Sequence, residues 1–145
     1  MNATWKRKPT SANVIAMGAI VVITTVGNEE QASLIASELV ARRLAACVNV
    51  LPGVRSVYRW QGKICRDGEH LLIVKTLESE REAVAAAIRE LHSYELPEIL
   101  SFPVGTGDER FLDWIADSVD ESAARAGDVD DEEEHPALDL DDSSF

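Results

Sequence analysis

The segment from His92 to Glu98 holds the densest set of side chains able to bind a metal ion. It places an imidazole, the phenol of Tyr94 and the carboxylates of Glu95 and Glu98 within seven residues. Borderline divalent cations such as Cu²⁺ and Zn²⁺ accept this mixture of nitrogen and oxygen ligands. A histidine that ends a helix and interacts with the helix dipole explains the pattern equally well. The first interpretation predicts a metal contact at His92 and Glu95.

Cys47 is a further candidate ligand, since a thiolate suits a soft ion such as Cu⁺. Its apolar neighbours Ala46 and Val48 favour the alternative of a small buried side chain, which is the commoner state of a free cysteine. Cys65 has no matching partner and is interpreted as incidental. Two cysteines without CxxC spacing are too few for a disulfide framework and predict a reducing, cytoplasmic location.

A second group of polar and aromatic side chains is predicted to line a cleft between subunits, with its lysines attracting an anion. The alternative, which we favour, is packing between subunits with the lysine amines reaching water. No nucleophile, base and orienting group occur together in a GxSxG, HExxH or Walker pattern, so no enzymatic activity is predicted. The group comprises Tyr58, Trp60, Lys63, Glu69, Lys75 and Tyr94.

The charge of this 145-residue chain is concentrated at one end. Residues 120–145 hold 11 of the 26 acidic groups and one of the 14 basic groups, and therefore carry −10 of the net −12. The remainder is nearly neutral, which argues against a nucleic-acid partner. Residues 1–17 and 121–145 are too polar to form a core and are predicted to be flexible extensions of one domain over 18–120. The apolar run 14–26 is too short for a membrane helix and is interpreted as a strand rather than a signal peptide.

The elements that must position these residues are predicted from changes in apolar periodicity and from turn signals. Pro52-Gly53 predicts a bulge in a long strand, and Asp67-Gly68 predicts the turn of an antiparallel hairpin. The order β-α-β-β-α-β plus a helix is that of an α+β, ferredoxin-like fold with both helices on one sheet face. The predicted strands are 19–25, 46–61, 71–76 and 99–104, and the predicted helices are 28–44, 78–92 and 108–119.

The other sheet face has no helix to cover it. Tyr58 and Trp60 point to one side of the long strand and Val57 to the other, so a lone domain leaves large apolar side chains in water. The hairpin also exceeds the usual strand length. We therefore predict that subunits pair through the long hairpin.

Several segments carry a family resemblance, among them Arg43-Leu44-Ala45-Ala46-Cys47-Val48-Asn49, Ser56-Val57-Tyr58-Arg59-Trp60-Gln61-Gly62-Lys63-Ile64, His92-Ser93-Tyr94-Glu95-Leu96-Pro97-Glu98 and Phe111-Leu112-Asp113-Trp114-Ile115. In this order and spacing they closely resemble the CutA family of divalent-cation tolerance proteins, over about residues 19–119. The resemblance implies a ferredoxin-like subunit in a cytoplasmic homotrimer, similar in architecture to PII signalling proteins and associated with copper and other divalent cations, without a settled enzymatic activity. Copper-binding members carry a cysteine near the end of the first strand, where this chain has Thr24. They also carry a second histidine next to the position of His92, where this chain has Leu91.

Three hypotheses of function remain open from the sequence. The first is a trimeric protein of divalent-cation tolerance that binds metal weakly near His92. The second is a PII-like sensor that binds a small anion or nucleotide in the cleft between subunits. The third is a scaffold whose acidic end recruits partners. The predicted partners are other copies of the chain and divalent cations, with no nucleic acid and no membrane.

Overall fold

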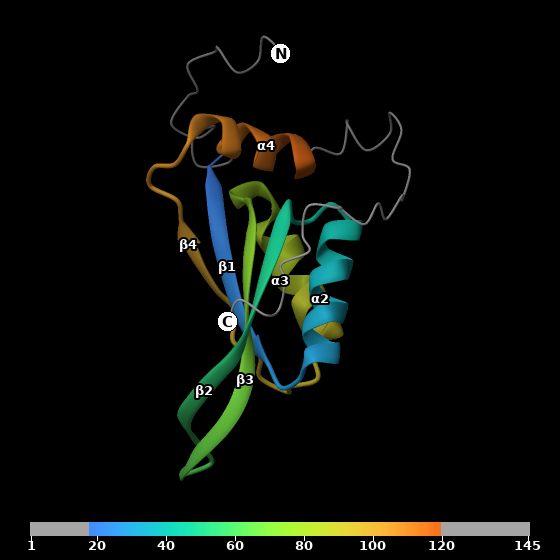
Figure 1. Cartoon of the computed structure of the whole chain (residues 1–145). Helices are drawn as coiled ribbons and strands as arrows, with labels where there is room; N and C mark the ends of the chain where they lie inside the picture. The colour runs from blue at the N-terminus through green and yellow to red at the C-terminus, as the bar shows by residue number, and fades with distance from the viewer. Residues whose placement is uncertain (1–17, 120–145) are drawn as a thin grey trace, which may run out of the picture.

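Four strands and three α-helices follow the predicted order along the chain (Figure 1). The computed structural model describes residues 18–119, so the predicted flexible extensions 1–17 and 121–145 lie outside the described residues. Over residues 18–119, no helix combines the length and the apolar character needed to cross a membrane. The elements are β1 (Ala19–Val26), α2 (Glu29–Ala41), β2 (Cys47–Trp60), β3 (Lys63–Leu77), the short 3-10 helix η2 (Glu78–Glu80), α3 (Arg81–Leu91), β4 (Leu100–Pro103) and α4 (Glu109–Val119).

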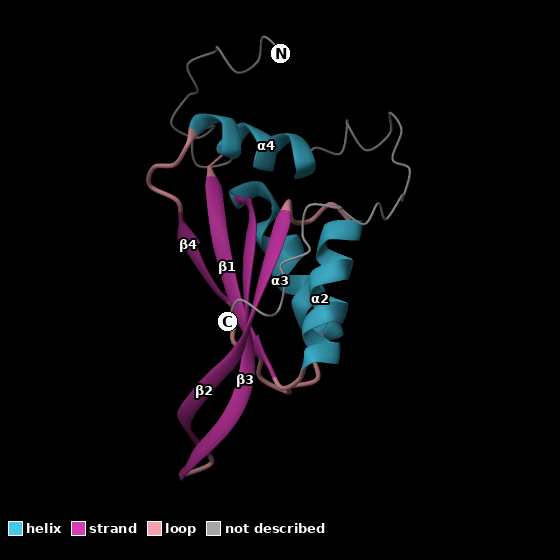
Figure 2. Cartoon of the chain, viewed as in Figure 1, coloured by secondary structure: helices cyan, strands magenta, loops and turns pink. Residues whose placement is uncertain are grey.

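The strands form one antiparallel sheet in the order β2-β3-β1-β4 (Figure 2). Strand β1 is central, because it pairs with β3 along its whole length and with β4 over Ile20–Ile23. Helices α2 and α3 lie side by side on one face (Figure 1). The ferredoxin-like prediction is confirmed. The opposite side of the sheet is called the open face below.

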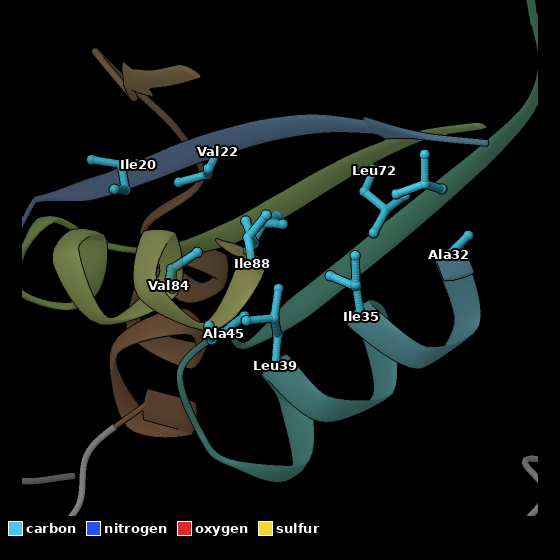
Figure 3. Close-up of a cluster of buried hydrophobic side chains, with 12 residues drawn as sticks. Ile20, Val22, Ala32, Ile35, Leu39, Ala45, Leu72, Val84 and Ile88 are labelled. Carbon is cyan, nitrogen blue, oxygen red and sulfur yellow. The ribbon is translucent and has the colours of Figure 1, made fainter. Parts of the chain in front are cut away.

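The main core lies between the sheet and helices α2 and α3 (Figure 3). Alternate residues of β1 are buried, as expected for a strand with one face against helices. Helix α2 supplies Ile35 and Leu39 to this core, and α3 supplies Val84 and Ile88. In the close-up these side chains point towards Ile20, Val22 and Leu72 of the sheet. Removal of this apolar surface from water fixes the helices on one face.

The predicted hairpin turn at Asp67-Gly68 is wrong. Asp67 pairs with Ser56 and Gly68 with Arg55 inside the ladder, and the turn is Gln61-Gly62. Gln61 has φ 49° and Gly62 has φ 77°, the two positive values that a type I′ turn requires. The actual turn sets a register in which Val48 lies opposite Val74 of the core. A turn six residues later would leave much of β2 without a partner in β3. The register is fixed because the pairing must keep the buried side chains of both strands on the core face.

Strand β2 is interrupted where Pro52-Gly53 predicted a bulge. The register shifts between Leu51 and Val54, and Gly53 has φ 77°. Beyond this bulge the hairpin continues as an arm, defined here as residues 54–68, which extends past the ends of the helices (Figure 1). None of the described helices therefore packs on either side of the arm.

Helix α2 ends three residues earlier than the sequence predicts. Helix α2 ends at Ala41 because Arg43 adopts φ 57° and the amide of Leu44 donates to the carbonyl of Leu39. Helix α4 lies across one end of the sheet and forms a separate apolar cluster (Figure 1). In that cluster Ile115 and Val119 pack with Ala46 and with Ala19 and Leu77.

Candidate functional site

His92 lies at the end of α3, where its backbone amide donates to the carbonyl of Ile88. The residue is only 8% exposed. Its Nε2 is 2.8 Å from the carbonyl oxygen of Thr25, and its Nδ1 is 3.0 Å from the backbone nitrogen of Tyr94. Since Nδ1 accepts from the amide of Tyr94, the ring proton on Nε2 is donated to Thr25. Both ring nitrogens therefore have protein partners.

Tyr94 connects this histidine to a buried carboxylate. Its ring centroid is 4.7 Å from that of His92, and its hydroxyl donates to Glu69 Oε2 over 3.0 Å. Glu69 is itself buried. Partial burial and then the hydrogen bond to Glu69 raise the pKa of Tyr94 to about 12. A methyl group at Gly27 would lie 3.0 Å from the Tyr94 hydroxyl, so the glycine leaves room for this phenol.

A second phenol and carboxylate pair lies next along β3. The hydroxyl of Tyr58 donates to Asp67 Oδ2, and this hydrogen bond is the main cause that raises the pKa of Tyr58 to about 12. Asp67 and Glu69 are two residues apart in one strand and so point to the same face, about 7 Å apart. The structure thus brings Tyr58, Glu69 and Tyr94 to one region of the open face, at the base of the arm.

Cys47 and Glu95 are not brought to His92 by a shared contact. Cys47 pairs with Lys75, and Thr25 pairs with Leu71, so Cys47 lies four residues, or about 13 Å, further along the sheet. Its Sγ lies 3.7 Å from Asn49 Oδ1. Glu95 is exposed and has no hydrogen bond or ion pair to another described residue. Residues 18–119 contain no group of three or more His, Cys, Asp or Glu side chains arranged to hold a metal ion.

The remaining predicted cleft residues lie at opposite ends of the long hairpin. Trp60 and Lys63 face each other at the tip of the arm. Lys75 lies at the other end of β3, with its Nζ 5.6 Å from the ring centroid of Phe111. The two lysines are 12 residues apart in one strand, about 40 Å, so within one chain they cannot bind the same small anion.

The carbonyl of Thr25 and the carboxylate of Asp67 are the parts of this region that sequence reasoning missed. A backbone carbonyl carries no sequence signal of its own. Asp67 was assigned to a turn because Asp-Gly is a strong turn signal. Alternation with Glu69 along a longer strand is the signal that would have placed it on the same face.

Comparisons with known proteins all indicate the same family. A family model described as CutA1 divalent ion tolerance protein matches residues 20–118. The divalent-cation tolerance protein CutA of Thermus thermophilus is 45% identical over 98 residues, which are 68% of this chain and 95% of that protein. The chloroplastic protein CutA of Arabidopsis thaliana is 41% identical over 100 residues, 69% of this chain and 55% of that protein. The chain therefore spans little more than half of this plant relative.

A solved structure agrees with these sequence matches. The crystal structure of CutA from Xylella fastidiosa superposes with a TM-score of 0.70 at 38% identity and covers 71% of this chain and 99% of that one.

Proposed function

This chain belongs to the CutA1 divalent ion tolerance family, and from that premise we propose that it supports tolerance of divalent metal cations by binding them weakly, as a homotrimer. The observation that carries the proposal is the family match over residues 20–118. In this proposal the cation is a ligand to be bound and released, and the protein catalyses no reaction. A cytoplasmic location belongs to the same proposal, since Cys47 and Cys65 are both free.

The proposed cation contact lies at the end of the sheet where His92, Glu69 and Glu95 are found. Carboxylate oxygens are available there as ligands. The His92 ring can coordinate a cation only if it gives up its hydrogen bond to the Thr25 carbonyl or the one from the Tyr94 amide. This cost explains why we expect weak binding. Cys47 is proposed as a separate contact for a soft ion such as Cu⁺.

The homotrimer is proposed because the open face carries large apolar side chains that no element within residues 18–119 of one chain covers. Phe102 is 49% exposed, and Leu100 beside it in β4 is exposed as well. The same face continues along the arm through Tyr58 and Trp60, which alternate with residues on the opposite side. Burial of such a patch between copies is the usual way to remove it from water. The number three rests on the resemblance to the family.

Cation binding is tested by titrating Cu²⁺ and Zn²⁺ into the full chain and into Glu69→Gln, His92→Ala and the control Glu30→Gln. Glu30 is an exposed carboxylate in the first turn of α2, so Glu30→Gln removes the same charge as Glu69→Gln at a distant position. We expect weaker binding in Glu69→Gln and His92→Ala and no change in Glu30→Gln. Equal binding in all four proteins would place the contact elsewhere, and the absence of binding to the wild type would contradict the proposed function itself.

Assembly is tested by light scattering. The wild type should have three times the 15.9 kDa mass of one chain. Phe102→Glu places a charge on the open face and should yield smaller particles, whereas Leu34→Glu should not, although Leu34 on α2 is exposed to a similar extent, 46%. A wild-type particle with the mass of one chain at micromolar concentration would contradict the trimer.

A further inference from the structure

The arm is the one strongly basic part of the described chain. Residues 54–68 contain Arg55, Arg59, Lys63 and Arg66 but a single acid, Asp67, giving a net charge of +3. The rest of residues 18–119 contains six basic and 14 acidic residues, a net charge of −8. A basic arm on an acidic protein is a defined target for a negatively charged partner.

Three of these cations share one side of the arm, called the arginine face here. The register pairs Arg55 with Gly68, Val57 with Arg66 and Arg59 with Ile64, and paired residues point to the same side. This side continues the helix-covered face of the sheet, beyond the point where the helices end (Figure 1). The proposed interface between copies lies on the opposite side, with Tyr58 and Trp60.

The arginine face is exposed and its charges are free. Val57 is 64% exposed and Ile64 is 59% exposed between the arginines. Arg55, Arg59 and Arg66 form no ion pair or hydrogen bond with another described residue. Along the arm the three arginines follow each other in steps of two residues, about 7 Å.

A segment of the same chain matches this surface in charge and spacing. Asp128, Asp130, Glu132 and Glu134 alternate along the sequence, within a block of six acids that lies outside the described residues. In an extended conformation these four carboxylates point to one side in the same steps of about 7 Å. The family match ends at residue 118, so this block is an addition to the family domain.

The chain between the domain and this block is long enough to span the distance. Helix α4 packs against Leu77. Along β3, Leu77 is 9 residues from Gly68, the partner of Arg55, and 13 residues from Ile64, the partner of Arg59, or about 30 and 43 Å. Asp128 and Glu134 follow Val119 by 9 and 15 residues, which extend to about 30 and 50 Å. We propose that the acidic segment 128–134 binds the arginine face of the arm and shields it from other polyanions. This proposal does not depend on metal binding.

The test is a competition experiment with the full chain. The probe is a labelled peptide of residues 126–137, and its binding is followed by fluorescence anisotropy at low ionic strength. In one variant the six acids of 128–134 are replaced by their amides, so that the chain's own segment no longer competes. We expect the peptide to bind this variant about five-fold more tightly than the wild type, as expected for the loss of a few exposed ion pairs. The binding should decline as salt is added.

The arginine face is identified by paired substitutions in the amide variant. Arg59→Gln with Arg66→Gln should weaken peptide binding several-fold. The control, Arg89→Gln with Arg110→Gln, removes the same charge from α3 and α4 and should have no such effect. Equal effects of the two pairs, equal peptide binding by wild type and amide variant, or no binding to any protein would each overturn the proposal. A duplex DNA probe that binds wild type and amide variant equally would also overturn it, since the face would then be open.

Discussion

The Nε2 of His92 donates a hydrogen bond to the carbonyl oxygen of Thr25, 2.8 Å away, at an edge of the sheet that no strand covers. Strand β4 pairs with β1 only as far as Ile23. At Thr25 the imidazole supplies the hydrogen-bond donor that a neighbouring strand would otherwise supply. The Nδ1 of the same ring accepts a hydrogen bond from the backbone amide of Tyr94. His92 thus joins the end of α3 to the central strand.

His92→Ala should lower the free energy of unfolding by about 2 kcal/mol, because two hydrogen bonds are lost in a largely buried site. Urea unfolding followed by circular dichroism measures this change. Ser93→Ala is the control, since Ser93 is exposed and contacts no described residue through its hydroxyl. Equal midpoints for the two variants would mean that the contacts of His92 do not hold in solution.

Two buried threonines on neighbouring strands should respond to valine in opposite ways. Thr76 Oγ1 donates to the carbonyl of Leu44 over 2.6 Å, so Thr76→Val should cost about 1 kcal/mol. Thr24 Oγ1 has no hydrogen-bond partner among the described residues, so Thr24→Val should leave stability unchanged or raise it by up to about 1 kcal/mol. Both side chains are fully buried, which makes the comparison direct. A loss of stability in Thr24→Val would reveal a partner for its hydroxyl.

Two glycines of the arm distinguish the observed turn from the turn expected from Asp67-Gly68. A Cβ at Gly62 or at Gly68 meets no atom within 4 Å, so neither substitution by alanine causes a clash. Only Gly62 has a positive φ, and Gly62→Ala should therefore destabilise the protein by about 1 kcal/mol, whereas Gly68→Ala should not. Thermal unfolding of both variants measures the difference. If Gly68→Ala were the less stable variant, the turn would instead lie at residues 67 and 68.

The stability of the protein should fall between about pH 10 and pH 12. Tyr58 and Tyr94 have pKa values of about 12 in the folded chain, whereas an unfolded tyrosine loses its proton near pH 10. The unfolded state therefore releases protons first as the pH rises, and the contribution of both phenols, complete below pH 10, is lost towards pH 12. Urea midpoints measured across this range should decline more steeply in the wild type than in Tyr94→Phe.

Absorbance of the phenolate reports the same pKa values directly, because the chain has only two tyrosines. Folded protein should show little phenolate until close to pH 12. Asp67→Asn removes the main cause of the shift at Tyr58 and should return one of the two titrations towards pH 10. Two ordinary titrations near pH 10 in the folded wild type would contradict both phenol and carboxylate pairs.

The order of elements was predictable because each element has its own periodic signal. The β-branched run of β1, the amphipathic α3 and the Pro52-Gly53 bulge are all local patterns. The turn was mispredicted because Asp67-Gly68 and Gln61-Gly62 both suit a turn, and only pairing with the rest of the sheet decides between them. Register is a property of the whole sheet.

The candidate site was predicted only as a collection of residue types. The sequence indicates that His92, Tyr94 and Glu95 are close along the chain, but not that His92 faces Thr25, 67 residues away. Tyr94 likewise finds Glu69 across 25 residues. Contacts of this kind depend on where α3 ends relative to the uncovered edge of β1, which no local pattern encodes.

Helix α4 packs on the sheet through an apolar cluster that is separate from the main core. Its apolar cluster with Ala46 shares no residue with the main core, and Arg43 Nη1 donates a hydrogen bond of 3.3 Å to the Ser118 carbonyl near the end of α4. Native-state hydrogen exchange should accordingly be faster in α4 than in β1 or β3. We therefore expect α4 to open while the sheet and helices α2 and α3 stay folded, and each opening would lengthen the stretch of chain that joins segment 128–134 to the sheet.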